Sequence, residues 1–281
     1  MIDVSVYVPI RNDFRYLAQC LTSLFSQSYP FAEVLVIDDA SSDGLQGWAQ
    51  GQNEFNIKYI RLEQHKGLAA ARNEALKHCT CDYIAAVDAD CVLNKDWLSI
   101  LIKYIQDGKV AGVGGHLFEV DSVRFLDLWR KAYLYQTCGT EKATVAYLPG
   151  CNTLFRKEAL NAIEGYNEAY YFHHEDTEIG QRLSVAGWQM IYVPDAIAYH
   201  NREDTLYSLM RRCWGYRHTS PILSMSSLGL DIAREFFKSV KNFIYDFTHF
   251  HFHFCCMIDS VYFFYQVMFS VRAYIQKNNN F

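Results

Sequence analysis

Two aspartates, Asp88 and Asp90, stand two positions apart directly after a short apolar run at residues 83–87. An apolar run of this length predicts a strand that is buried on both faces. Residues i and i+2 of an extended chain project to the same side, so both carboxylates would face one point. Mg²⁺ and Mn²⁺ prefer oxygen ligands and are often held by one or two carboxylates together with substrate phosphates. The pair therefore predicts a metal–diphosphate site, although an Asp-x-Asp pair alone is also typical of a solvated turn.

A second acidic cluster lies in the run His173–Glu178, where three acids fall within four positions. Repulsion among Glu175, Asp176 and Glu178 raises at least one of their pKa values. The dipole of the helix that follows lowers these pKa values, so the sequence leaves the net shift open. A carboxylate at this position could serve as a general base. The alternative is ordinary capping of the helix N-terminus, with Glu178 paired to Arg182 one turn later.

Polar residues also stand at the ends of two other predicted strands, at 4–10 and 34–37: Pro9, Arg11, Asn12, Asp38 and Asp39. Ligands of open α/β sheets bind at the carboxyl ends of the strands. We therefore expect these residues and the Asp88–Asp90 pair to share one binding site. No GxGxxG follows the first strand and no P-loop pattern occurs, which disfavours a dinucleotide site and a P-loop nucleotide site.

The scaffold for these side chains is predicted by an alternation of two patterns over the first 120 residues. Buried-strand patterns at 4–10, 34–37, 58–62 and 83–87 alternate with helical patterns at 17–25, 67–78 and 98–105. Beyond residue 110 the alternation loosens, with strand candidates at 110–120 and 190–193 and a helix that stops at Gly187. This rhythm predicts an α/β fold with a mostly parallel, twisted central sheet flanked by helices on both faces.

Composition limits the functional class. The chain has 281 residues, with 31 acidic and 26 basic side chains and a formal net charge of −5. A hydrophobic content of 51% argues against disorder, and the lack of a basic excess argues against a nucleic-acid partner. Nine cysteines at irregular spacing, none in a CxxC pair, favour free thiols in a reducing compartment. The N-terminus has no basic region or cleavage site typical of a secretory signal, so we expect a cytoplasmic protein.

These motifs, in this order, resemble the inverting family-2 glycosyltransferases with the GT-A fold. The matching stretch runs from about Val4 to His200 and contains VSVYVPIRND, VLVIDDASSDG, KGLAAARNEAL, DYIAAVDAD, LPGCNTLFRKEAL and HEDTEIGQRLSVAGW followed by VPDAIAYH. The resemblance implies a Rossmann-like GT-A catalytic domain at residues 1–220. Within it, residues 1–115 would form the nucleotide-sugar half and residues 116–220 the acceptor half. Residues 221–281 would form an aromatic-rich helical extension.

The resemblance also implies a role for each matching residue. The nucleotide would contact five residues: Pro9, Arg11, Asp39, Arg72 and Asp88. Asp39 would contact the base, which is normally uracil. Asp90 would ligate a divalent Mn²⁺ or Mg²⁺ ion, with Asp88 beside it and His200 completing the site as in some relatives. Asp176 would be the catalytic base, and Glu175 would shape the acceptor side, which would also include Asn152, Arg212 and Trp214.

The implied reaction is a metal-dependent, inverting transfer of a hexosyl or N-acetylhexosaminyl group. The donor would be a nucleotide-diphosphate sugar, normally UDP-linked, and the acceptor a hydroxyl of a glycan or lipid-linked molecule in cell-envelope polysaccharide synthesis. We expect a single addition, because Arg211-Arg212-Cys213-Trp214 lacks the Gln of the Gln-x-x-Arg-Trp motif of processive synthases. Two alternatives remain, a sugar-phosphate nucleotidyltransferase and a catalytically silent GT-A binding module.

The extension at 221–281 lies outside the resemblance. Asp246, Asp259 and Arg272 interrupt its apolar runs, so we do not expect a membrane-spanning helix. Packing on the catalytic domain or a homodimer contact is the first expectation for this extension. Lysines among many Phe and Tyr are also compatible with an amphipathic element that lies on the inner face of the cell membrane. The segment 249–253, in which His alternates with Phe, predicts a strand with one aromatic face, or a helix whose histidines could bind metal.

Overall fold

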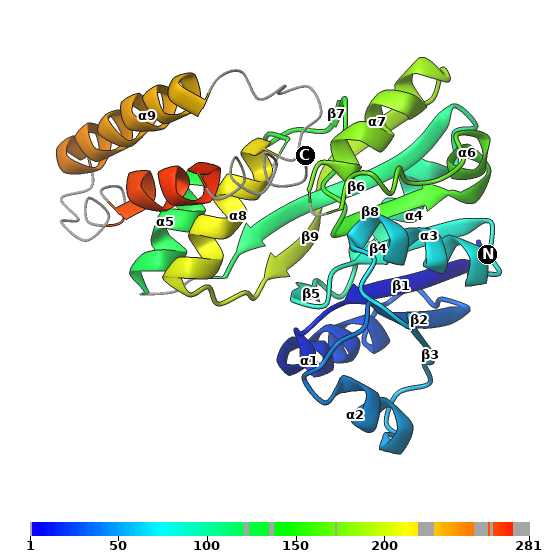
Figure 1. The fold of residues 1–281 in the computed structure, drawn as a ribbon. Coiled ribbons are helices and arrows are strands. Elements are labelled where there is room, and N and C mark those ends of the chain that lie inside the picture. The colour runs from blue at the N-terminus through cyan, green and yellow to red at the C-terminus, as the bar shows by residue number, and fades with distance from the viewer. Residues whose placement is uncertain are drawn as a thin grey trace, which may run out of the picture. The chain divides into compact units, whose positions relative to one another are not determined.

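A computed structural model describes residues 2–120, 124–134, 138–171, 173–218, 228–249, 258 and 261–271. The chain forms two compact units, of which the first comprises residues 1–120 and 136–202 and the second residues 121–135 and 203–281 (Figure 1). The sequence placed a boundary at residue 220 instead. The two divisions differ because the segments near 129 and 209 share an apolar core with the C-terminal residues. The functional division into a nucleotide half and an acceptor half stays a prediction.

The first unit is organised on one sheet with the strand order β3-β2-β1-β4-β8-β6-β9-β5, in which β7 pairs with β9. In chain order the strands are β1 (Val4–Ile10), β2 (Glu33–Asp38), β3 (Lys58–Arg61), β4 (Tyr83–Val87), β5 (Cys91–Leu93), β6 (Val110–Glu119), β7 (Ala143–Thr144), β8 (Asn152–Arg156) and β9 (Gln189–His200).

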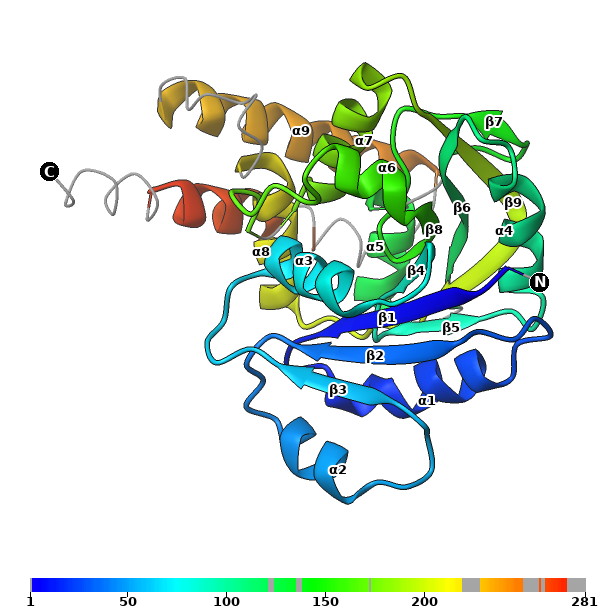
Figure 2. The same ribbon diagram turned by 90° about the vertical axis from the view of Figure 1, so that its right-hand side faces the viewer.

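The sheet is mostly parallel, as predicted. Strands β1, β2 and β3 run side by side in parallel (Figure 2), and β4 continues the parallel set on the other side of β1. Strands β6 and β9 are also parallel to each other, whereas β8 is antiparallel between β4 and β6. Because β1, β2 and β4 are parallel, their carboxyl ends meet at one edge of the sheet.

Helices cover both faces of this sheet. They are α1 (Phe14–Phe25), α2 (Leu45–Gly51), α3 (Leu68–His78), α4 (Trp97–Ile105), α6 (Lys157–Ala162) and α7 (Glu175–Val185). Consecutive side chains of a strand project to opposite faces. In β1, Val6 and Val8 accordingly pack in the cluster that contains α1 and α4. Tyr7 packs on the opposite side with α3, α6 and α7.

The second unit is helical over its described residues. It contains α5 (Phe125–Tyr133), α8 (Leu206–His218), α9 (Leu228–His249) and a helical segment at 261–271. Trp129, Leu209 and Tyr262 are buried in its core. The helical extension expected at the C-terminal end is therefore present. His249 ends α9, and the rest of the predicted His–Phe strand or metal site lies outside the described residues.

Over the residues that the structure describes, no helix is both long enough and apolar enough to cross a membrane. The seven cysteines found in the described residues are all free thiols.

Candidate functional site

A cleft with a volume of about 270 Å³ lies at the carboxyl ends of β1, β2 and β4. Its lining includes five residues to which the sequence assigned nucleotide or metal roles: Pro9, Arg11, Asp39, Asp88 and Asp90. The structure thus brings together side chains that are up to 81 positions apart in the chain, counted from Pro9 to Asp90. It also adds residues to the cleft that the sequence did not single out, among them Asp13, His65, Tyr171 and Arg202.

The adjacent carboxylates at the end of β2 have different surroundings. Asp38 is fully buried and contacts the side chains of Tyr59 and Arg61 and the backbone N–H of Ser41. Burial raises the pKa of Asp38, but the hydrogen bonds from Ser41, Tyr59 and Arg61 outweigh burial and hold the pKa below its ordinary value. Asp39 instead lines the cleft. Asp38 therefore stabilises the fold, whereas Asp39 lines the cleft although its side chain is only 5% exposed.

Asp39 also orders the loop between β3 and α3. Its carboxylate accepts hydrogen bonds from the backbone N–H groups of Lys66 (2.7 Å) and Gly67 (2.9 Å). The ring nitrogen Nδ1 of His65 lies 2.7 Å from the same carboxylate. Gly67 has a φ of +91°, and a Cβ there would lie 2.5 Å from the carbonyl oxygen of Tyr171. Only glycine therefore allows this close approach of the loop to Tyr171.

His65 and Tyr171 form an aromatic wall of the cleft, with ring centroids 4.9 Å apart. The Tyr171 hydroxyl also donates to the carbonyl oxygen of His65 at 3.3 Å. Sequence reasoning missed this wall. The two residues are 106 positions apart, and no periodic pattern connects them, so only their aromatic type could have drawn notice.

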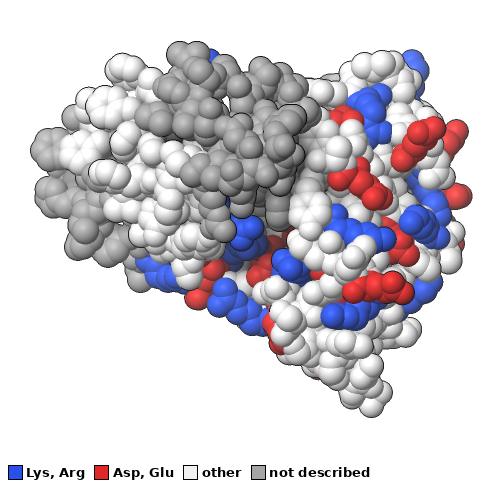
Figure 3. All heavy atoms as spheres, in the orientation of Figure 1, with Lys and Arg blue, Asp and Glu red and all other residues white. Residues whose placement is uncertain are grey.

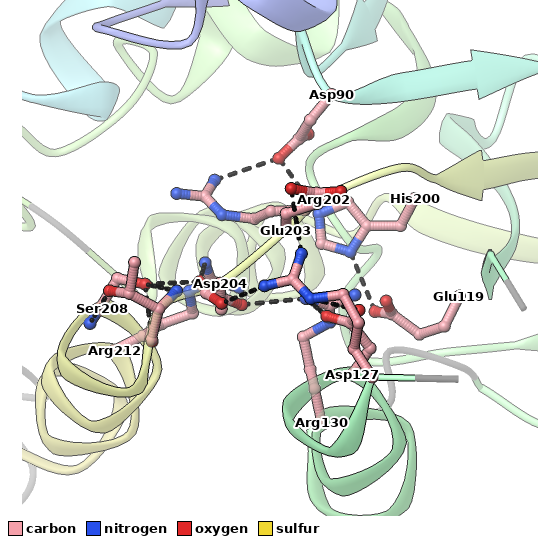
Figure 4. Close-up of polar contacts among 12 residues, drawn as sticks. Asp90, Glu119, Asp127, Arg130, His200, Arg202, Glu203, Asp204, Ser208 and Arg212 are labelled. Atoms are coloured by element: carbon pink, nitrogen blue, oxygen red, sulfur yellow. Dashed lines mark hydrogen bonds and ion pairs between the residues drawn. The ribbon is translucent and has the colours of Figure 1, made fainter. Parts of the chain in front are cut away.

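Asp90 also lines the cleft and lies in a cluster of charged groups (Figure 4). Its Oδ2 atom is 3.2 Å from Nε2 of His200 and 3.0 Å from Nη1 of Arg202. The opposite ring nitrogen of His200, Nδ1, lies 2.9 Å from Oε1 of Glu119. Burial lowers the pKa of His200, but the carboxylates of Asp90 and Glu119 outweigh burial and raise it to about 10. Antiparallel pairing of β5 with β9 places Cys91 opposite His200 and so brings Asp90 to this imidazole.

The donor set at Asp90 fits a divalent cation. A carboxylate oxygen and an imidazole nitrogen converge there. Because Glu119 holds Nδ1, a metal ion that displaces the Nε2 proton of His200 would take Nε2 as its ligand atom. Asp88 lies two residues away, with about a third of its side chain exposed. Within the described part of the chain, no group of three or more His, Cys, Asp or Glu side chains forms a metal cage. The set thus suits an ion whose remaining ligands are phosphate oxygens and water.

Arg72 lies beneath the cleft, because its side chain is only 1% exposed. Its Nη1 donates to the carbonyl oxygen of Gly150 at 2.7 Å and to the Tyr7 hydroxyl at 3.3 Å. Its Nη2 lies 3.3 Å from Oδ1 of Asp88, and its Nε lies 3.7 Å from Oε1 of Glu175. The sequence assigned Arg72 to direct nucleotide contact. In the structure it instead connects Asp88 to the start of α7, so any effect on a nucleotide passes through Asp88.

The acidic run that begins α7 divides into three environments. Glu175 is buried, and burial together with the neighbouring Asp176 raises its pKa to about 8 despite the nearby Arg72. Asp176 is half-buried, and its Oδ1 accepts the backbone N–H of Thr177 at 2.7 Å. Glu178 forms two hydrogen bonds of 2.7 Å with Arg182. The alternative pairing considered for Glu178 is therefore present.

Asn152 requires a correction. The sequence placed it on the acceptor side, but the side chain is fully buried inside the sheet. Its Oδ1 accepts the indole N–H of Trp97, and its Nδ2 donates to the carbonyl oxygens of His116 (3.0 Å) and Ala196 (3.4 Å). These bonds join α4, β6 and β9, so Asn152 holds the sheet together and does not face an acceptor.

Arg212 and Trp214 belong to the second unit. Arg212 donates to Oδ1 of Asp204 at 2.7 Å, in a buried network that also contains Arg130 (Figure 4). The indole N–H of Trp214 donates to the Ser270 hydroxyl at 3.2 Å. Both side chains thus have structural partners, and their acceptor-side role stays a prediction.

The mostly parallel sheet, with carboxylates gathered in a cleft at its strand ends, defines an α/β protein of the GT-A type. The chain belongs to glycosyl transferase family 2, whose family model matches residues 5–164. The "Pre-mycofactocin glycosyltransferase" of Mycobacterium tuberculosis is 28% identical over 75% of the chain, which spans 45% of that relative. The "Poly-beta-1,6-N-acetyl-D-glucosamine synthase" of Staphylococcus epidermidis is 24% identical over 74% of the chain, which spans 52% of it. The chain thus spans about half the length of these relatives.

Solved structures share the fold. The crystal structure of S. aureus TarS 1-349 has a TM-score of 0.58 and 24% identity, covering 76% of this chain and 64% of that one. Related crystals of TarS contain UDP or UDP-GlcNAc. The mannosyltransferase PcManGT from Pyrobaculum calidifontis, in complex with GDP-Man and Mn²⁺, has a TM-score of 0.55 and 19% identity, covering 92% of this chain and 73% of that one.

Proposed function

We propose that the protein is a metal-dependent inverting glycosyltransferase. It transfers one hexosyl or N-acetylhexosaminyl group from a nucleotide-diphosphate sugar, most simply a UDP-sugar, to a hydroxyl of a glycan or lipid-linked acceptor. The observation that carries the proposal is the placement of Pro9, Arg11, Asp39, Asp88 and Asp90 in one cleft of a family-2 chain. The UDP and UDP-GlcNAc bound by TarS and the N-acetylglucosamine polymer named for the S. epidermidis relative support the choice of donor and of a glycan acceptor.

In this proposal the nucleotide base lies by Asp39 and the aromatic wall of His65 and Tyr171. The wall offers a ring surface for stacking, and Asp39 offers carboxylate oxygens to an N–H of the base. Arg11 is exposed in the cleft and carries the positive charge that a phosphate group requires.

Asp90 and His200 would hold the metal, with Asp88 beside them. When bound, the ion supplies positive charge that stabilises the departing diphosphate. Arg202 contacts the same oxygen of Asp90 and also lies 3.6 Å from Asp13. Arg202 therefore neutralises Asp90 in the metal-free cluster.

Asp176 would remove the proton from the acceptor hydroxyl, which then attacks the anomeric carbon from the face opposite the leaving diphosphate. Its Oδ1 accepts hydrogen bonds from Thr177, whereas Oδ2 accepts none from the described residues. Glu175 differs, because it is buried and its raised pKa of about 8 keeps it largely protonated at neutral pH. Of the pair, Asp176 is thus the better base, and a neutral Glu175 limits the repulsion between them.

The test combines nucleotide binding with turnover of the full chain. Calorimetry with UDP, GDP and dTDP, each with and without Mn²⁺, should show UDP binding that requires the metal. Asp90→Asn should weaken Mn²⁺-dependent binding at least about tenfold, and Asp39→Ala should weaken UDP binding specifically. Asp195→Asn, which changes an exposed carboxylate on β9, is the matched control.

Turnover separates the proposal from its alternatives. Release of UDP from UDP-sugars should fall at least about a hundredfold in Asp176→Asn while UDP affinity is retained. Tight UDP binding without any turnover of UDP-sugars would favour a silent binding module. Production of a UDP-sugar from UTP and a sugar phosphate would favour a nucleotidyltransferase. If no nucleotide binds with or without metal, the proposal is wrong.

A further inference from the structure

Among the described side chains of helix α9, two uncharged polar residues are buried and the apolar residues are exposed. Ser239 and Asn242 are buried, with exposed fractions of 7% and 8%. Phe237 is 70% exposed and Ile244 is 56% exposed. A helix that packs on a protein core normally buries its apolar stripe. The reversed arrangement leaves a large apolar surface facing away from the core of the second unit.

This surface extends over the neighbouring helical segment at 261–271. The ring centroids of Phe236 and Phe263 are 5.7 Å apart. Within each of the two segments, the neighbouring rings Phe236–Phe237 and Phe263–Phe264 have the same centroid distance. Phe264 is itself 70% exposed. We call the continuous surface the aromatic face and define it by its exposed members: Phe236, Phe237, Val240, Phe243, Ile244, Phe264 and Met268. In the view of Figure 3 the described atoms on the side of α9 are almost all uncharged, whereas the first unit shows mixed acidic and basic groups.

A row of basic residues borders the aromatic face on one side. Arg234, Lys238 and Lys241 follow one another at spacings of four and three residues, which places them along one edge of the helix. All three are exposed. Lys238 also lies over the ring of Tyr262, at 5.3 Å from its centroid, which ties this edge to the 261–271 segment.

We infer that the aromatic face binds the surface of a lipid bilayer that contains anionic lipids. Phenylalanine and aliphatic side chains on one side of a helix, bordered by Lys and Arg, are the arrangement with which amphipathic helices lie in the headgroup region. The basic edge favours negatively charged headgroups over neutral ones, because each Lys or Arg near such a surface is attracted to it. The inference concerns the second unit alone and does not depend on the proposed glycosyl transfer.

The test is flotation of the full chain with vesicles of phosphatidylcholine alone or with about 30% phosphatidylglycerol, at low and high salt. We expect at least about tenfold more protein on the anionic vesicles, and less at high salt because salt screens the basic edge. The double variant Phe237→Ser and Phe264→Ser should lower vesicle binding at least about tenfold. The double variant Arg234→Gln and Lys241→Gln should lower only the preference for anionic vesicles.

Matched controls separate this result from loss of folding and from self-association. Val185→Ser removes an apolar side chain that is 91% exposed on α7, outside the aromatic face, and should bind vesicles as wild type does. Circular dichroism and thermal melting must show each variant folded. Phe237→Trp provides a direct probe, since brominated acyl chains should quench its fluorescence. Absence of vesicle binding by the folded wild type would overturn the inference. So would a dimer in solution, measured by sedimentation, that the Phe237→Ser and Phe264→Ser variant dissociates.

Discussion

The Nε atom of Arg72 lies 3.7 Å from Oε1 of Glu175, and both side chains are buried. Nε has no hydrogen-bond partner, while the other guanidinium nitrogens bind Gly150 and approach Asp88. One guanidinium thus supports both the cleft carboxylate Asp88 and the first residue of α7. Its position makes Arg72 a residue that orients other groups and does not itself reach the cleft.

Replacing Arg72 should therefore strongly affect stability. Arg72→Met should lower the free energy of unfolding by about 3–5 kcal/mol, because it leaves Asp88 without its cation and the buried carbonyl oxygen of Gly150 without its donor. Arg72→Lys keeps the positive charge but loses the planar guanidinium group, so it should lower the free energy of unfolding less than Arg72→Met does. Urea unfolding measures both, with Arg15→Met, an exposed arginine on α1, as the control. Equal stability of Arg72→Met and Arg15→Met would contradict the buried network.

Glu175 should make stability depend on pH in an unusual direction for a carboxyl group. Its pKa is raised to about 8 in the folded chain, against about 4.3 when unfolded. Between these values the folded state holds a proton that the unfolded state has lost, so the stability due to Glu175 falls as pH rises from about 4.3 to 8. Glu175→Gln cannot ionise. As the pH rises over this range, its free energy of unfolding should therefore increase relative to that of the wild type, by on the order of 1–3 kcal/mol. Unfolding of both proteins from pH 5 to 9 tests this, and parallel pH curves would refute it.

The neighbours Asp38 and Asp39 should respond differently to substitution. Asp38→Asn removes a buried charge held by Arg61 and Tyr59 and should lower the free energy of unfolding by about 1–3 kcal/mol. Because the folded pKa of Asp38 is lowered, its stabilisation is present above about pH 4 and is lost as pH falls through the folded value. Asp39→Ala should act mainly on UDP affinity. Thermal melting at pH 3 to 7 measures the stability of both variants, and calorimetry measures their affinity for UDP. A larger loss of stability in Asp39→Ala, together with a larger loss of UDP affinity in Asp38→Asn, would contradict these roles.

Arg202 should compete with a metal ion at Asp90. Its Nη1 lies 3.0 Å from Oδ2 of Asp90, and about 30% of its side chain is exposed. Arg202→Gln should raise the affinity for Mn²⁺ alone about three- to tenfold, because a cation is removed from the ligand oxygen. Arg202→Lys keeps the positive charge and serves as the matched control. Mn²⁺ titration followed by electron paramagnetic resonance gives the dissociation constants, and weaker Mn²⁺ binding by Arg202→Gln would exclude competition.

The ionic network of the second unit should depend on Asp204. This carboxylate is 1% exposed and accepts from Arg130 at 2.9 Å and from Arg212 at 2.7 Å. Asp204→Asn should lower the free energy of unfolding by about 3–5 kcal/mol, since both arginines lose the negative charge of a buried partner. Glu203→Gln changes an adjacent carboxylate that is 60% exposed and paired with Arg124, and it should cost less than about 1 kcal/mol. Hydrogen exchange across α8 together with urea unfolding measures both changes. Similar values for the two variants would show that the network contributes little.

Much of the fold was predictable because local patterns determine it. Continuous apolar runs marked β1, β2 and β4, and their parallel order followed from the helices between them. The sequence alone was enough to place the carboxylates at the ends of those strands at one edge of the sheet. The antiparallel position of β8 between β4 and β6 could not be predicted, because the periodicity of a strand does not show which distant strand it pairs with.

The sequence by itself determined which residue types stand at the strand ends, and with them the class of site, since strand periodicity and parallel order put Asp39, Asp88 and Asp90 at one edge. Only the tertiary structure decided what surrounds each group. It buried Asn152 inside the sheet, placed Arg72 beneath the cleft, and brought Arg202 to Asp90 across 112 positions of chain. Burial and charge pairing depend on contacts between distant segments, and those contacts form only when the sheet and its helices pack together.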